Sequence, residues 1–206
     1  MAVTEGRRAR KKRETAERIA LAAGTLFAER GYEAVSVVDI AEAADVSEQT
    51  VYNHFATKED LVFDRTDELD AALAAAVAQR PAGTSAAVAV APILHGILDR
   101  ISGLTFDQHS GGMPSLAATS PALRRAGLER TRRHAATIAR ALDDDPTSSA
   151  APSPEHSIAG WAIAGLLQLL IEELGSAHER GEQPADAAVR LRGEVDRQVT
   201  LLSALS

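Results

Sequence analysis

Residues 36–54 read SVVDIAEAADVSEQTVYNH. The spacing of the apolar residues predicts two short helices, over residues 37–44 and 47–53, with a tight turn between them at Asp45. Ser36, followed three residues later by an aspartate, is typical of a capping box at the start of the first helix. The stretch therefore has the plan of a helix-turn-helix.

The packing of two such helices sets requirements at three positions. The helices can touch only where a side chain is small, and Ala41 provides that position. Val51, ten residues later, is an aliphatic residue that can plug the second helix against the first. Asp45 must leave the right-handed helical region at the turn, where glycine is easier but aspartate is better tolerated than most residues. These three residues satisfy the requirements of the motif.

Helical spacing extends on both sides of the motif. It predicts a helix over residues 13–30, and another that begins at Lys58 and continues to Pro81. Longer helices are predicted over residues 85–106, 121–142, 155–178 and 185–205. We therefore expect an all-α protein of about nine helices. Its N-terminal three-helix domain would cover residues 1–58, and a C-terminal helical domain residues 59–206.

The composition agrees with this class and excludes several others. Alanine, the best helix former, accounts for 41 of the 206 residues, whereas there are only four Phe, two Tyr and one Trp. The absence of cysteine excludes disulfides, thiolate metal sites and cysteine nucleophiles. No metal-binding, phosphate-loop or nucleophile motif is present, so we expect no cofactor, no metal and no enzymatic activity. The longest apolar run, 158–171, is shorter than the ~20 residues that span a bilayer, which predicts a cytoplasmic protein without a membrane partner.

The charge is divided unevenly along the chain. The net charge is −7, yet residues 1–58 contain nine basic and nine acidic residues, so the whole excess lies in residues 59–206. Six of the seven residues in 7–13 are basic. This asymmetry predicts an N-terminal end that faces a polyanion. We expect residues 7–13 to form a flexible arm that follows a phosphate strand or enters a minor groove. Five arginines between residues 124 and 133 occur on every side of their helix and predict a solvated surface.

The residues around the motif resemble one known family. Residues 19–61 read IALAAGTLFAERGYEAVSVVDIAEAADVSEQTVYNHFATKEDL, which resembles the DNA-binding domain of the tetracycline-repressor (TetR) family. The matching elements are Ala22-Ala23, Leu26-Phe27, Gly31-Tyr32, Ser36-Val37, Ile40-Ala41, Val46-Ser47, Thr50-Val51-Tyr52, His54-Phe55, Lys58-Glu59 and Leu61. Asp45 departs from the usual turn glycine, and Glu48 is an acidic residue where a phosphate backbone would lie close. The resemblance implies that residues 47–54 are a recognition helix in the major groove of an operator.

The side chains of this segment suit DNA contacts. Gln49 and Asn53 can pair with adenine edges, and Thr50 can donate to a base or present its methyl group to thymine. Lys58 opposes the dipole of its own helix, which is explained if a phosphate lies at that helix N-terminus. Tyr52 has the alternative role of a half-buried packing residue. The candidate DNA contacts are Arg10, Lys11, Lys12, Ser36, Ser47, Gln49, Thr50, Tyr52, Asn53, His54 and Lys58.

The helix over 155–178 is apolar around nearly its whole circumference, so it must be covered on two sides. The resemblance implies that this helix and the last one form a four-helix interface in a homodimer; the alternative is a central core helix in a monomer. The candidate interface residues are Gly160, Ala164, Leu167, Ile171, Val195, Val199 and Leu202.

The resemblance also implies a cavity for a small apolar or mixed-polarity effector between residues 67 and 142. Its candidate lining residues are His95, Leu98, His109, Met113, Trp161 and Gln168. Effector binding would swing the helix that begins at Lys58 and change the spacing of the two recognition helices. The predicted function is a ligand-responsive repressor that binds a pseudo-palindromic, double-stranded operator in the nucleoid. The alternatives are a DNA-binding regulator that needs no ligand, and a small all-α enzyme or scaffold.

Overall fold

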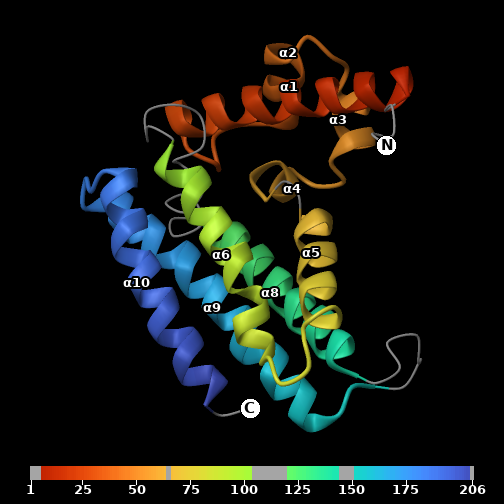
Figure 1. Ribbon diagram of the computed structural model, residues 1–206. Helices are drawn as coiled ribbons and strands as arrows, with labels where there is room; N and C mark the ends of the chain where they lie inside the picture. Colours follow the sequence, from red (N-terminus) through yellow and green to blue (C-terminus); the bar gives the residue numbers. More distant parts are fainter. Residues whose placement is uncertain (1–5, 64–65, 104–119, 144–150, 205–206) are drawn as a thin grey trace.

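The computed structural model describes residues 6–63, 66–103, 120–143 and 151–204. These residues form nine helices and no strand (Figure 1), which confirms the predicted all-α class. The helices build two units around separate hydrophobic cores. The first unit contains the helix-turn-helix, and the second is a bundle of longer helices.

The first unit consists of α1 (Arg7–Arg30), α2 (Val37–Ala43), α3 (Glu48–His54) and α4 (Lys58–Val62). Large apolar side chains from α1, α2 and α3 are almost fully buried in its core, among them Ile19, Phe27, Ile40 and Val51. Helix α1 begins at Arg7 rather than at residue 13, so the prediction of a flexible basic arm is wrong for residues 7–13. The basic residues form the first two turns of the helix instead.

The helix predicted from Lys58 to Pro81 is also wrong in one respect, because the structure has two helices there. Helix α4 ends after five residues, and Phe63 at its C-terminus has left the helical conformation, with φ −108° and ψ 44°. Helix α5 (Thr66–Ala78) follows. Leu61 and Val62 pack in the first core, so the hydrophobic core of the first unit continues beyond the predicted boundary at residue 58.

The second unit contains α5, α6 (Ala86–Ser102), α8 (Pro121–Leu142), α9 (Pro154–Glu179) and α10 (Pro184–Ser203). Side-chain hydroxyls cap three of these helices, from Ser85, Ser120 and Ser153. Proline at the first position of α8, α9 and α10 fits a helix start, where its missing N–H has no helical partner. The bounds agree with the predicted ranges to within a few residues, except that α6 ends at Ser102.

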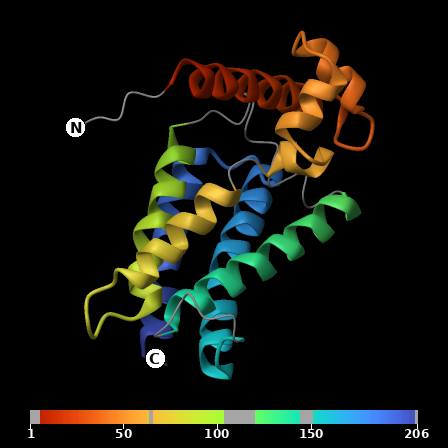
Figure 2. The ribbon, with the colours of Figure 1, turned by 90° about the vertical axis from the view of Figure 1, so that its right-hand side faces the viewer.

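Helix α8 extends from the bundle to the first unit, and its N-terminal end lies next to that unit (Figure 2). Leu123, near its N-terminus, is fully buried in the first core, whereas Ile138, near its C-terminus, is fully buried in the second. The 22 residues of α8 therefore form a continuous connection between the two cores.

Helix α9 has 26 residues and a mean hydropathy of 1.4 over its most apolar window, so by length and composition alone it could cross a membrane. The apolar run 158–171 alone is shorter than a membrane span, but the helix that contains it is longer. The same properties are found in the core helices of globular proteins, and α9 has nine buried residues. It also packs closely against α8, because Gly160 lies where any side chain would overlap the carbonyl oxygen of Ala135.

Candidate nucleic-acid interface

The turn between α2 and α3 has the predicted geometry. Asp45 adopts φ +51°, in the left-handed region, and is the sole non-glycine residue with a positive φ among the described residues. The backbone N–H of Val46 donates to the carbonyl oxygen of Ala41 at 3.0 Å. Ala41 and Val51 are buried between the helices. The three positions that identified the motif therefore act as the sequence analysis predicted.

Burial on one face of α3 leaves the other face exposed. Val51 is 1% exposed, whereas Gln49, Tyr52 and Asn53 are exposed, Tyr52 at 48%. About half of the Tyr52 side chain is therefore free to contact a partner, and the half that is covered fits the alternative role of a half-buried packing residue. The Nε2 of Gln49 donates to the Oδ1 of Asn53 at 3.2 Å, which aligns the two amides along this face. The result is an exposed row of hydrogen-bonding groups on α3, which the buried Val51 on its opposite face holds in place.

Ser47 and Thr50 take part in the capping of α3. The Oγ of Ser47 accepts from the backbone N–H of Thr50 at 3.1 Å, and the two hydroxyl oxygens lie 2.8 Å apart. Ser47 is therefore the N-cap of α3, which begins where the sequence predicts it to within one residue.

The basic turns of α1 lie beside the end of α3. Burial lowers the pKa of His54, and the positive charge of Lys12 lowers it further. Arg10 and Arg13 face glutamates one turn further along α1, at 3.6 Å from Glu14 and 3.5 Å from Glu17. These are exposed pairs that water screens strongly.

Ser36 and Thr57 begin their helices with capping boxes, and the one at Ser36 is predicted by the sequence. The backbone N–H and the hydroxyl of Ser36 both donate to the carboxylate of Asp39, and these hydrogen bonds lower the pKa of that carboxyl. At α4 the backbone N–H of Thr57 donates to Asp60 Oδ2 at 3.0 Å. A carboxylate thus already accepts hydrogen bonds at the start of α2 and of α4, and the start of α4 is where a phosphate is predicted from Lys58.

Lys58 has a different environment from the one predicted. Its Nζ donates to the carbonyl oxygen of Tyr32 at 2.5 Å and lies 4.0 Å from the centroid of the Tyr32 ring. The ring of Phe27 is 5.7 Å away. Burial lowers the pKa of the ammonium group, and Glu33, Glu59 and Asp39 partly offset this by attraction. Contacts within the first unit therefore account for a lysine that helix electrostatics alone does not explain.

Comparison with known proteins agrees with this geometry. The family model for bacterial regulatory proteins of the tetR family matches residues 16–64. The HTH-type transcriptional regulator TcmR of Streptomyces glaucescens is 32% identical over 152 residues, which cover 68% of this chain and 67% of TcmR. The chain belongs to the TetR family of DNA-binding transcriptional regulators. The resemblance of residues 19–61 is thereby confirmed.

Solved structures share the fold along nearly the whole chain. A TetR-family transcriptional regulator from Mesorhizobium loti has a TM-score of 0.55 at 19% identity and covers 98% of both chains. FadR of Thermus thermophilus, a repressor crystallised with lauroyl-CoA, has a TM-score of 0.51 at 23% identity, with 91% of this chain and 92% of that chain covered. At these identities the comparison supports the TetR fold, including its C-terminal bundle.

The predicted effector-binding residues are scattered over this bundle. Leu98 is fully buried in the second core, and Trp161 is 52% exposed on α9. His95 Nε2 lies 2.9 Å from Asp196 Oδ1 on α10. Gln168 accepts from the Thr131 hydroxyl at 3.0 Å and donates to Glu172. His109 and Met113 lie outside the described residues. Leu98 is thus packed in the core while about half of Trp161 faces outward, and the effector site stays a prediction.

Five of the seven predicted dimer residues are buried within the chain itself, so their side chains are not exposed for contact with a second copy. The set Gly160, Ala164, Leu167, Val195 and Val199 is buried within the chain, and Ile171 and Leu202 pack against the second core. Because α9 is apolar all round, its sequence did not show which face the chain itself covers. The exposed apolar residues on α9 and α10 are instead Ile158, Trp161, Leu169, Val189 and Leu201.

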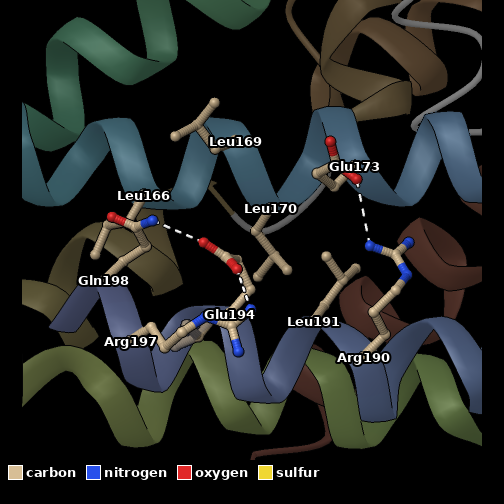
Figure 3. Close-up of a pocket in the computed structure, with 10 residues that line it drawn as sticks. Leu166, Leu169, Leu170, Glu173, Arg190, Leu191, Glu194, Arg197 and Gln198 are labelled. Carbon is tan, nitrogen blue, oxygen red and sulfur yellow. Dashed lines mark hydrogen bonds and ion pairs between the residues drawn. The ribbon is translucent and has the colours of Figure 1, made fainter. Parts of the chain in front are cut away.

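A groove of about 450 Å³ runs between α9 and α10 on this outer side (Figure 3). Leu166, Leu170 and Leu191 form part of its apolar lining. The charges at its rim are paired, because Arg190 lies 3.4 Å from Glu173, and Glu194 accepts from both Arg197 and Gln198. Sequence reasoning missed this groove, since it depends on how the two helices pack.

Proposed function

We propose that this TetR-family regulator is a ligand-responsive repressor that binds a pseudo-palindromic operator as a homodimer. The observation that carries the proposal is the exposed row of Gln49, Tyr52 and Asn53 on a helix anchored by buried Val51. Such a helix fits the width of the DNA major groove, and a two-fold dimer presents two of them to successive grooves.

The row on α3 contains groups for both bases and phosphates. The amides of Gln49 and Asn53 can each form two hydrogen bonds with adenine, in exchange for the single one that they now share. Thr50 lies between them in sequence and can contact a neighbouring base. Tyr52 and His54 suit the flanking phosphates as neutral donors, since the pKa of His54 is lowered. The hydroxyl groups of Ser36 and Ser47 already cap α2 and α3, so they can contact DNA only while they also make these capping hydrogen bonds.

The basic turns of α1 extend this surface as a helix. Arg10, Lys11 and Lys12 are exposed, and Lys12 is close enough to α3 to affect His54. A helical segment suits phosphate contacts beside the major groove better than entry into a minor groove. Lys58 can reach a phosphate only if it leaves the carbonyl oxygen of Tyr32.

We assign the homodimer interface to the outer side of α9 and α10. Ile158, Trp161 and Leu169 lie on one face of α9, because spacings of three and eleven residues are close to whole helical turns. Gly165 is on the same face, with open space where a side chain would be. The apolar lining and paired charges of the neighbouring groove suit an apolar helix of a second copy.

The effector of this proposal is a small apolar or mixed-polarity molecule bound in the second unit. Its core is built mainly from leucine, isoleucine, valine and alanine. The neighbour from Thermus thermophilus was crystallised with lauroyl-CoA, so a protein of this fold accommodates an acyl ligand. Repression, the usual output of the family, and a location in the cytoplasm with the nucleoid complete the proposal.

A gel-shift assay with DNA that flanks this protein's own coding region tests the proposal. The wild-type chain should retard a specific fragment, Gln49→Ala with Asn53→Ala should lose the specific complex, and Gln79→Ala, an exposed control beyond α5, should retain it. A saturating concentration of folded protein that retards no fragment specifically would refute the proposal and favour the enzyme or scaffold alternatives.

A further inference from the structure

One segment of α8, residues 127–134, contacts three other helices; we call it the junction turn. Arg130 binds Asp60 of α4, His134 Nδ1 lies 2.6 Å from Asp70 Oδ1 of α5, and Thr131 donates to Gln168 of α9. About two turns of α8 therefore contact α4 of the first unit, α5 at the start of the second unit, and α9, whose outer side is exposed.

Arg130 makes the contact with the first unit. Its Nη2 donates to Asp60 Oδ1 at 2.6 Å, and its guanidinium lies 4.2 Å from the centroid of the Phe63 ring. The side chain is 15% exposed, so it is not part of the solvated surface predicted for the arginines of this helix. A charge-assisted hydrogen bond combined with stacking on an aromatic ring fixes both position and direction.

Asp60 joins this contact to the structure of α4. Its Oδ2 accepts from the backbone N–H of Thr57 and its Oδ1 accepts from Arg130. The same carboxylate thus caps α4 and holds α8. Phe63, which stacks on Arg130, is the residue at which α4 ends. Arg130 therefore contacts both the carboxylate that caps the start of α4 and the residue at which α4 ends.

Helix α4 ends at Val62, and Phe63 has left the helical conformation, so α4 and α5 are separate helices. Helix α8, by contrast, is one continuous helix from Pro121 to Leu142. Its N-terminal half is fixed to the first unit at two further points: Leu123 is buried in the first core, and the Ser120 hydroxyl donates to Glu33 Oε1 at 2.5 Å. Helix α8 is thus the element best placed to set the angle of the first unit.

We propose that Arg130 is a positioning residue for the recognition helix: through Asp60 and Phe63 it fixes α4, and with it α3, relative to the bundle that carries the outer face of α9. This rests on the proposed function, in which the spacing of two recognition helices selects the operator. Thr131, the next residue, links the same turn to Gln168 of α9. A shift of α9 in the bundle would therefore move the junction turn of α8, and through Arg130 and α4 it would change the position of α3.

The test measures the angle without DNA. The chain contains no cysteine, so spin labels can be attached at Glu48→Cys on α3 and Glu179→Cys on α9, both exposed positions. Pulsed electron paramagnetic resonance then gives the distribution of distances between the labels. Labelled protein diluted into an excess of unlabelled protein reports only the distance within one chain. The variants are Arg130→Gln, Asp60→Asn, which retains an acceptor for Thr57, and Arg132→Gln as an exposed control on the same helix.

We expect Arg130→Gln and Asp60→Asn to shift or broaden the distance distribution similarly, and Arg132→Gln to match the wild type. Distributions of folded Arg130→Gln or Asp60→Asn that coincide with the wild type would overturn the proposal, as would equal broadening by Arg132→Gln. Loss of the fold in both variants would also overturn it, because the contact would then be part of the core rather than an adjustable joint.

A second measurement uses the fragment retarded in the gel-shift assay. Arg130→Gln should weaken its binding by about tenfold with an unchanged salt dependence, since no phosphate contact is lost. A reduced salt dependence would mean that Arg130 contacts DNA and would contradict a positioning role. If the wild-type chain retards no DNA, the proposed function fails, and the distance measurement still decides the role of Arg130.

Discussion

The ammonium group of Lys58 lies over the ring of Tyr32, 4.0 Å from its centroid, and donates to the carbonyl oxygen of the same residue at 2.5 Å. Twenty-six residues separate the two in sequence. The contact ties the start of α4 to the chain that follows α1, and so helps to hold the helix-turn-helix on the helix behind it. It gives Lys58 a structural role alongside any role on DNA.

Replacement of Lys58 separates these two roles. Lys58→Met keeps most of the apolar stem but loses the hydrogen bond and the cation–π contact, so we expect a loss of about 1–2 kcal/mol in the free energy of unfolding. Urea denaturation measures this, with Lys11→Met on the exposed side of α1 as the control. Unchanged stability together with lost operator binding would instead support the phosphate contact suggested by the sequence.

Local sequence rules predicted the first unit well because its signals are short-range. Capping residues such as Ser36 and Ser47, and the turn residue Asp45, act within a few positions of themselves. The end of α4 at Phe63 was missed, since helical spacing continues from Leu61 to Leu69 and the break accompanies a contact with Arg130 on a distant helix.

The outer face of α9 was missed for a related reason. In an apolar helix the pattern does not distinguish the side that the chain covers from the side that it exposes. Gly160 was assigned to the dimer because glycine allows close approach between helices, which is correct. The approaching helix is α8 of the same chain.

The close approach of α8 and α9 at Gly160 predicts how substitution of this glycine changes stability. Gly160→Ala places a methyl group against the carbonyl oxygen of Ala135 and should destabilise the fold by about 1–3 kcal/mol, since α8 or α9 must shift. Gly193→Ala in α10 is the matched control: its methyl group would meet the flexible end of Arg197 at 3.7 Å, and alanine favours the helix by up to about 1 kcal/mol. Thermal unfolding of the two variants should therefore move in opposite directions. Equal melting temperatures would show that α8 and α9 adapt freely.

The lowered pKa of His54 gives a pH dependence of known sign. Because burial and Lys12 disfavour the charged form, the folded state binds fewer protons than the unfolded state just below the ordinary pKa of about 6.5. Stability should therefore decrease as the pH falls through that value. NMR titration of the His54 ring, assigned with His54→Gln, should give a pKa below that of an exposed histidine. Lys12→Gln should raise it, whereas no change would mean that the basic turn of α1 lies further from α3.

Neutral substitutions on α1 test its electrostatic role better than deletion, which would shorten a helix. Lys11→Gln with Lys12→Gln should weaken operator binding, and each lost phosphate contact should reduce the slope of log affinity against log salt by about 0.9. Binding titrations at several salt concentrations measure this slope. Arg100→Gln, exposed on α6, should leave it unchanged. A slope unaffected by the α1 substitutions would remove these turns from the interface.

The dimer face is tested by placing a charge in its centre. Leu169 is 55% exposed on α9, so Leu169→Glu should leave the isolated chain folded and introduce an unpaired charge into a contact with a second copy. We expect a loss of about 2 kcal/mol or more in association, which is a weakening of at least about thirtyfold. Sedimentation equilibrium measures it, and the emission of Trp161, the single tryptophan, should shift to the red as its environment becomes wet. Leu128→Glu is the matched control, because Leu128 is 65% exposed on a different helix, α8, and does not line the groove between α9 and α10. If Leu128→Glu dissociates the protein and Leu169→Glu does not, the second copy binds to α8, and the outer face of α9 is left for another partner.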